Sequence, residues 1–142
     1  LHLAHDGAGI NSLVGVPNIY PEQEEVQCTT LDEYRLDNDF DAIDLLKIDA
    51  EGHDLEVLYG ARKLIENQAI SIIQFEYNWR WIYSGKFLRN AFDFLLPMGY
   101  EIFKVTPLGL LEMGEYTADY ETFIEGNYIA SVPEYRRLFR II

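Results

Sequence analysis

Short apolar runs alternate with helical spacing along the middle of the chain. The first run, at residues 43–48, stops at the small and acidic residues DAEG at 49–52. Beyond that point, apolar residues recur at the three- and four-residue spacing of one helical face, at Val57, Leu58, Ala61, Leu64 and Ile65. This pattern predicts a strand, an acidic turn and a helix over 53–67, which together form half of a βαβ unit.

A second strand and helix follow the first pair. Residues 70–76 form the next apolar run, and 86–96 carries an apolar helical face that Pro97 and Gly99 bring to an end. Ser84 is a candidate cap for this second helix. A shorter helix is predicted to begin after Thr30, because a hydroxyl three residues before Glu33 has the spacing of a capping box.

The remaining segments predict short strands around this centre. We expect strands at 1–5, 26–29, 100–105, 108–113 and 128–132, with a hairpin turn at 106–109. The basic residues after Pro133 fit the last turn of a helix. The expected fold is α/β: the carboxyl-terminal half of a doubly wound domain with a terminal antiparallel hairpin. A complete small α/β fold, in which the first strands pair along the sheet edge, is the alternative.

Carboxylates stand where the two predicted strands end. Side chains alternate along a strand, so Lys47 and Asp49 share one face, as do Gln74 and Glu76 on the next strand. In open α/β sheets, ligands bind beyond the carboxyl ends of the strands, which places Asp49, Glu51 and Glu76 where chemistry would be done. The alternative is a Lys47–Glu76 ion pair that only satisfies two half-buried charges.

Aromatic residues follow the second strand directly, in the sequence YNWRWIY at 77–83. On this fold they would overhang the cleft, so Asn78, Trp79 and Arg80 are candidate substrate-binding residues, with Arg80 offering a planar fork to an acidic or hydroxylated group. Ordinary packing or a homodimer contact would explain the same residues. His53 opens the preceding helix near the cleft and is a further candidate, either as a proton acceptor or as a structural residue.

Charge and composition restrict the classes of function. A net charge of −13 opposes binding to nucleic acids or anionic membranes, because both attract lysine and arginine. No apolar run reaches the length of about 18 residues that a membrane span needs, and no signal segment opens the sequence. The single cysteine, Cys28, cannot form an internal disulfide, and we expect it to be a buried, inert thiol. The expected location is cytoplasmic.

The central segment LLKIDAEGHDLEVLYGARKLI resembles the signature of FkbM-type methyltransferases, a strand reading K-I-D-x-E-G followed by an acidic, leucine-rich helix and a G-A pair. TLD at 30–32, FEYN at 75–78 and NYIASVP at 127–133 are similar to further blocks of that family. The resemblance implies a Rossmann-like, class I sheet and an enzyme that uses S-adenosylmethionine, in many members to methylate hydroxyl groups. It also makes Asp49 and Gly52 candidate cofactor-binding residues.

The family's glycine-rich cofactor loop lies well upstream of this signature, and Asp6–Gly9 is followed by Asn11, Ser12 and Pro17 in place of the helix and later glycines of such a loop. We therefore expect a single FkbM-like domain over 1–142 whose amino-terminal, cofactor-binding half is missing. The predicted function is O-methylation of a small molecule or glycan hydroxyl, with Asp49 favoured as base or substrate ligand and Glu51 next. Glu76 is a further candidate base, and Lys47 lies on the substrate side. A divalent metal is a less favoured option. A non-catalytic partner-binding module and a carboxylate-based hydrolase are the alternatives.

Overall fold

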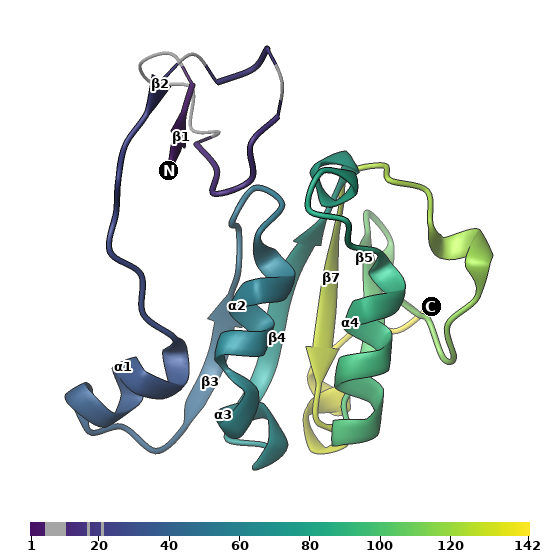
Figure 1. Ribbon diagram of the computed structural model, residues 1–142. Helices are drawn as coiled ribbons and strands as arrows, with labels where there is room; N and C mark the ends of the chain where they lie inside the picture. Colours follow the sequence, from purple (N-terminus) through teal and green to yellow (C-terminus); the bar gives the residue numbers. More distant parts are fainter. Residues whose placement is uncertain (5–10, 17, 21) are drawn as a thin grey trace.

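The computed structural model describes residues 1–4, 11–16, 18–20 and 22–142, and they form a mixed α/β architecture (Figure 1). The large sheet has five strands in the order β3-β4-β7-β5-β6. Strand bounds are β3 Ile43–Lys47, β4 Ile70–Tyr77, β5 Glu101–Thr106, β6 Gly109–Glu112 and β7 Gly126–Ser131. The β3–β4 pair is parallel, whereas β7 runs antiparallel to both β4 and β5. The predicted α/β class and the β5–β6 hairpin are therefore confirmed.

Helices cover one face of this sheet (Figure 1). They are α2 Asp54–Gly60, α3 Arg62–Glu66 and α4 Leu88–Leu95, while α1 Leu31–Asn38 lies beside α2 and α3. The core lies between sheet and helices, and its fully buried side chains include Leu55, Leu58, Ile65, Ile73, Phe75, Phe92 and Tyr128. Because Ile73 and Phe75 are buried under the helices, Gln74 and Glu76 of the same strand project to the other face, as alternation predicts.

The helix predicted over 53–67 is interrupted at Ala61, and the reason lies outside the helix. The Asp32 carboxylate of α1 accepts hydrogen bonds from the backbone N–H groups of Lys63 and Leu64, at 2.9 and 3.1 Å. These donors belong to the first turn of α3, so Asp32 caps a helix that begins anew. Gly60 approaches Thr30 of the neighbouring segment, where an added Cβ would lie 3.5 Å from the Thr30 Cβ, and this is its packing role.

The amino-terminal strands differ from the prediction. Strand β1 covers His2–Leu3 and pairs with β2 at Glu22–Gln23, so the two form a separate small sheet and do not extend the edge of the large one. His5 lies outside the described residues. The strand predicted at 26–29 is wrong, because this segment is an exposed connection without strand pairing, and Cys28 is exposed there rather than buried. An apolar segment forms a strand only where a neighbouring strand is available to pair with it.

Two predicted helix ends are also corrected. The α4 helix begins at Leu88, where Asn90 bonds back to the Phe87 N–H, whereas the Ser84 hydroxyl donates to the Trp81 carbonyl and caps nothing. The carboxyl-terminal tail forms only a 3₁₀ segment, Pro133–Leu138. Its Arg136 pairs with Glu101 and Glu112, so the charge serves the β5–β6 hairpin instead of a helix dipole.

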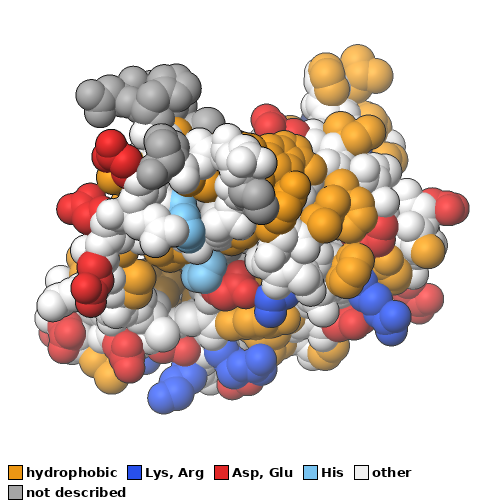
Figure 2. All heavy atoms as spheres, turned by 45° about the horizontal axis from the view of Figure 1, so that its top comes forward, with side chains coloured by type: hydrophobic (Ala, Val, Ile, Leu, Met, Phe, Trp, Pro, Cys, Tyr) orange, Lys and Arg blue, Asp and Glu red, His pale blue; other side chains and the backbone are white. Residues whose placement is uncertain are grey.

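The carboxyl ends of β3 and β4 lie at the same end of the sheet, at the top of Figure 1, and Figure 2 brings this end forward. Hydrophobic side chains gather there to one side, and the exposed residues that follow β4 include Ile82, Tyr83 and Phe87. Among the described residues, no helix is long and apolar enough to cross a membrane.

Candidate functional site

The turn after β3 has a constrained backbone. Glu51 adopts a positive φ of 52° and Gly52 one of 95°, a region that side chains disfavour. A Cβ added to Gly52 would lie 2.7 Å from the Cβ of Arg80, so the close approach of the segment after β4 requires glycine here. Lys47 donates to Asp49 at 2.7 Å, which confirms that these two side chains share one face of the sheet. The pair that Lys47 forms is therefore with Asp49 and not with Glu76.

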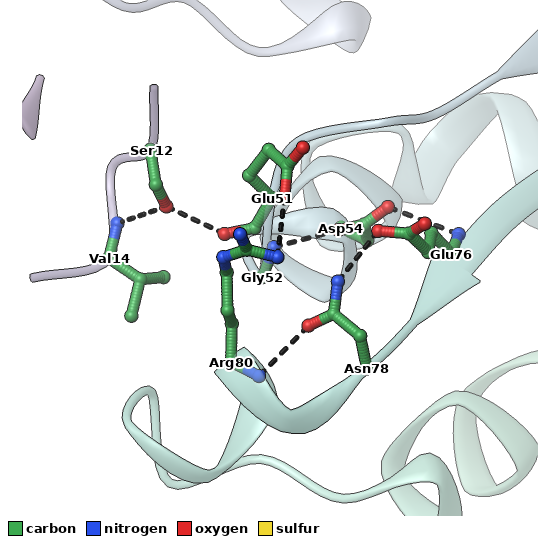
Figure 3. A network of polar contacts seen from close by, with 8 residues as sticks. All are labelled: Ser12, Val14, Glu51, Gly52, Asp54, Glu76, Asn78 and Arg80. Atoms are coloured by element: carbon green, nitrogen blue, oxygen red, sulfur yellow. Dashed lines mark hydrogen bonds and ion pairs between the residues drawn. The ribbon is translucent and has the colours of Figure 1, made fainter. Parts of the chain in front are cut away.

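Asp54 holds this turn against the end of β4 (Figure 3). Its carboxylate accepts the Gly52 N–H at 3.3 Å and the Glu76 N–H at 3.2 Å, and the residue is fully buried. Burial raises the pKa of the Asp54 carboxyl to about 6, although the backbone N–H donors act in the opposite direction. At the start of a helix, local sequence indicates for Asp54 only a favourable charge near the positive end of the helix dipole. Its burial depends on β4, which local sequence does not reveal.

Glu76 follows the same alternation on the neighbouring strand. Residue Lys47 lies opposite Gln74, so alternation puts Asp49, just past the end of β3, on the same face as Glu76 near the end of β4. The Asn78 amide donates to the Glu76 carboxylate at 2.6 Å, and the Asn78 oxygen accepts the Arg80 N–H at 2.9 Å. Burial raises the pKa of the Glu76 carboxyl, and Asn78 opposes that shift. The charges of Glu125, Glu51 and Asp49 raise it further.

Arg80, in the segment after β4, contacts Glu51 in the turn after β3. Its guanidinium contacts the Glu51 carboxylate at 2.8 Å with both side chains mostly buried, and it stacks over the Trp79 ring at 4.7 Å. Burial raises the pKa of the Glu51 carboxyl, against the opposing charge of Arg80. The Arg80 guanidinium, which was expected to meet a substrate, is thus turned toward the protein and holds Glu51 in place.

A residue far upstream completes the network. The Ser12 hydroxyl, almost fully buried, donates to the Glu51 carbonyl at 2.6 Å and accepts the Val14 N–H at 2.9 Å (Figure 3). Nothing in the spacing of Ser12 indicated this role, because the contact spans a separation of 39 residues. The sequence neighbourhood of 49–54 is consequently held from three directions, by the amino-terminal segment, by α2 and by the segment after β4.

A family model for the Methyltransferase FkbM domain matches residues 9–102, which include Ser12, the whole 43–54 strand and turn, and Glu76 to Arg80. The chain belongs to the FkbM methyltransferase family. No curated protein and no solved structure matches this chain. The resemblance seen in the KIDAEG signature is therefore confirmed, and the matched residues include the network around that signature.

The aromatic segment of this FkbM domain divides between core and surface. Tyr77 and Trp81 are fully buried and pack edge to face, so they belong to the core and not to a substrate wall. Trp79 and Tyr83 face each other outside it, with Tyr83 half exposed. Within the described residues, therefore, only Trp79 and Tyr83 of the predicted aromatic wall lie outside the core, and Asn78 is buried.

His53 is separated from the carboxylates although it follows Gly52 directly. Its Nδ1 lies 3.8 Å from the Glu56 carboxylate, and the side chain lines a cavity between α2 and the connection that precedes α1. Within the described parts of the chain, no group of three or more His, Cys, Asp or Glu side chains is arranged to hold a metal ion. The carboxylates of Asp49 and Glu76 are groups that can accept a proton or attract a positive charge.

Proposed function

We propose that this FkbM domain takes part in S-adenosylmethionine-dependent O-methylation of a hydroxyl group on a small molecule or glycan. The observation that carries the proposal is the register of β3 and β4, which puts Asp49 just past the end of β3 on the same face as Glu76 near the end of β4, inside the residues that the family model matches. Ligands of open α/β sheets bind at this end of the strands. The family supplies the reaction class, and the two carboxylates supply groups that can serve it.

The topology supports a Rossmann-like sheet. Strands β3 and β4 are parallel and joined through helices on one face, which is the crossover unit of doubly wound folds. The antiparallel β7 and the β5–β6 hairpin then close one side of the sheet. On this reading the described strands are the carboxyl-terminal half of the domain, and β3 lies where a further half would begin.

The charges of the site fit the cofactor. S-adenosylmethionine supplies a transferable methyl group on a positively charged sulfur, and carboxylates attract such a charge. Asp49, half exposed and beside Glu76, is the residue we assign to that side. Gly52 has a different role from the one the sequence suggested: its N–H is bonded to Asp54 and its Cα faces Arg80, so we assign it to the shape of the turn.

The protein groups would act on the acceptor as follows. A hydroxyl placed against Glu76 or Asp49 would give its proton to a carboxylate as its oxygen gains the methyl group, so the carboxylate ends protonated and the ether carries no charge. Burial raises the pKa of Glu76, so its carboxylate accepts a proton more readily than that of an exposed glutamate. Positioning of the acceptor by these groups supplies most of the gain.

Calorimetry with S-adenosylhomocysteine tests the cofactor half of the proposal, which requires saturable one-to-one binding. Asp49→Asn removes the charge that we assign to the sulfonium side and should reduce methyl transfer to a panel of hydroxylated acceptors by about a hundredfold or more, the size of effect that loss of one positioned electrostatic group has. Asp44→Asn is the matched control, because it removes an exposed carboxylate from the same strand. Near-wild-type transfer by Asp49→Asn, with an unchanged melting temperature, would refute the catalytic assignment.

One observation favours the second candidate, a partner-binding module. Among the described strands, β3 pairs only with β4, and Leu45 on it is 56% exposed. Such an edge is a surface on which another chain can add a strand. Failure of S-adenosylhomocysteine to bind, together with self-association that Leu45→Lys abolishes, would favour this module over the enzyme.

A further inference from the structure

Asn78 is a fully buried polar residue directly after the end of β4. Its backbone is extended, and it precedes the 3₁₀ segment Trp79–Ile82. The sequence made it a candidate to bind substrate, but a side chain without accessible surface does not meet one. Its polar contacts are therefore with the protein, and one of them leads to a carboxylate of the candidate site.

The two polar atoms of the Asn78 side chain each have a partner, and these partners fix how the amide is turned (Figure 3). The Arg80 backbone N–H can only donate, so the Asn78 atom 2.9 Å from its nitrogen is the amide oxygen. The amide nitrogen then points to Glu76 and donates to its Oε2 at 2.6 Å. The Arg80 backbone thus keeps this donor aimed at the carboxylate.

Glu76 is held by this contact without being closed off. Asn78 takes only Oε2, and the Glu76 residue is partly exposed. The Glu76 N–H donates to the Asp54 carboxylate at 3.2 Å, so the backbone is fixed as well. A glutamate side chain has several rotatable bonds, and a short charge-assisted hydrogen bond from a buried donor restricts them to one arrangement. Oε1 then keeps a fixed direction.

The surroundings of Glu76 otherwise oppose its ionised form. Burial raises the pKa of its carboxyl, the Asn78 donor acts against that shift, and neighbouring carboxylates raise the pKa further. The nearby cations of Lys47 and Arg80 are already paired with other carboxylates, so Asn78 is the hydrogen-bond donor that stabilises the Glu76 charge. The charged groups that face Glu76 are Lys47 of β3, Asp49 and Glu51 of the following turn, Asp54 of α2, and Glu125 just before β7.

We propose that Asn78 is a positioning residue for Glu76, which holds the carboxylate ionised and turned so that Oε1 accepts the proton of the acceptor hydroxyl. The inference rests on the proposed function, in which Glu76 is a candidate base. It accounts for an amide at this position. Aspartate would fit the same space but would repel Glu76, and serine would satisfy the Arg80 N–H without reaching Oε2.

The titration of Glu76 tests the role of Asn78 without any acceptor. The protein is prepared with glutamate isotope-labelled at the side-chain carboxyl carbon, and Glu76→Gln identifies the Glu76 signal in the NMR spectrum. Asn78→Ser removes the donor but keeps an oxygen for the Arg80 N–H. It should raise the proton affinity of Glu76 by about tenfold, the effect of one lost charge-assisted hydrogen bond, and so move the midpoint to higher pH.

Asn127→Ser is the matched control. Asn127 lies directly opposite Glu76 on β7, but its side chain accepts a hydrogen bond from Gln74 at 2.8 Å. The same substitution there should leave the Glu76 midpoint unchanged. Circular dichroism checks that each variant is folded.

The wild-type protein supplies a second measurement, which does not depend on the folding of a variant. The side-chain amide signal of Asn78 should change with the same pH midpoint as the Glu76 carboxyl, because the two groups are hydrogen-bonded. An amide signal that ignores this titration, an unchanged midpoint in Asn78→Ser, or equal changes in Asn78→Ser and Asn127→Ser would overturn the proposal. Calorimetry with S-adenosylhomocysteine judges methyl transfer separately, since a failure of that ligand to bind leaves the Glu76 titration as it is.

Discussion

Asp54 should make the stability of the protein depend on pH in a defined direction. Its pKa is about 6 in the folded chain against an ordinary value of 3.8, because the carboxyl is buried. The folded state therefore binds a proton more tightly than the unfolded state between these values. By linkage, the free energy of unfolding falls as pH rises through this window, and it is fully lowered once the pH is above the folded value.

The size of the effect follows from the same two values. One unit of difference in pKa corresponds to about 1.36 kcal/mol, so ionising buried Asp54 lowers the free energy of unfolding by about 3 kcal/mol between about pH 3 and pH 7. Asp54→Asn removes the titration but keeps one oxygen acceptor for the turn. Its own cost should be about 1–2 kcal/mol at low pH, from the lost acceptor for the second N–H.

Urea denaturation followed by tryptophan fluorescence measures this directly, since Trp81 is fully buried. The difference in free energy of unfolding between wild type and Asp54→Asn should change by about 3 kcal/mol over the pH range, in favour of the variant at higher pH. Asp44→Asn, at an exposed position of β3, corrects for the general effect of removing one negative charge. Parallel pH profiles for wild type and Asp54→Asn would refute the assigned burial cost.

Further substitutions test the contacts that hold the site. Asp32→Ala should destabilise the fold by about 1–2 kcal/mol in urea, the cost of a lost helix cap, whereas Asp37→Ala on the same helix should cost about 0.5 kcal/mol or less; equal costs would contradict the capping role. Glu121→Ala should lower the free energy of unfolding by about 2–4 kcal/mol, because this carboxylate accepts two N–H groups at the start of α4 and two tyrosine hydroxyls. A loss below about 1 kcal/mol would show that water replaces the carboxylate. Gly52→Ala should cost about 1–3 kcal/mol more than Gly85→Ala, since both glycines have positive φ but only the added methyl at Gly52 meets Arg80; matching melting temperatures would remove the close approach from the explanation.

The alternation of polar and apolar residues was sufficient to place β3, β4 and the turn after β3, but not the amino-terminal strands. Those features depend on residues close together in the chain, where periodicity carries the information. Family resemblance supplied the reaction class, which no periodicity could. The capping box at Thr30 was likewise readable from a spacing of three residues.

Contacts across the fold were not readable in this way. Asp32 and Glu121 cap helices that begin about thirty residues away, and Asp54 is buried only because β4 ends beside it. Cys28 was predicted to be buried because its neighbours are apolar. It is exposed, because its segment has no strand to pair with among the described residues. Arg80 was predicted to meet a substrate, whereas its guanidinium binds the Glu51 carboxylate, a contact that the spacing of the two residues does not reveal.

The hydrogen bond from Ser12 to the Glu51 carbonyl makes the amino-terminal segment a working part of the signature turn. A variant shortened to begin after residue 24 would retain every strand of the large sheet and every helix, yet it would release the backbone on which Glu51 and its neighbours are aligned. Cleavage in that stretch is therefore expected to loosen the signature turn, and an assay that reads only the large sheet would not detect the change.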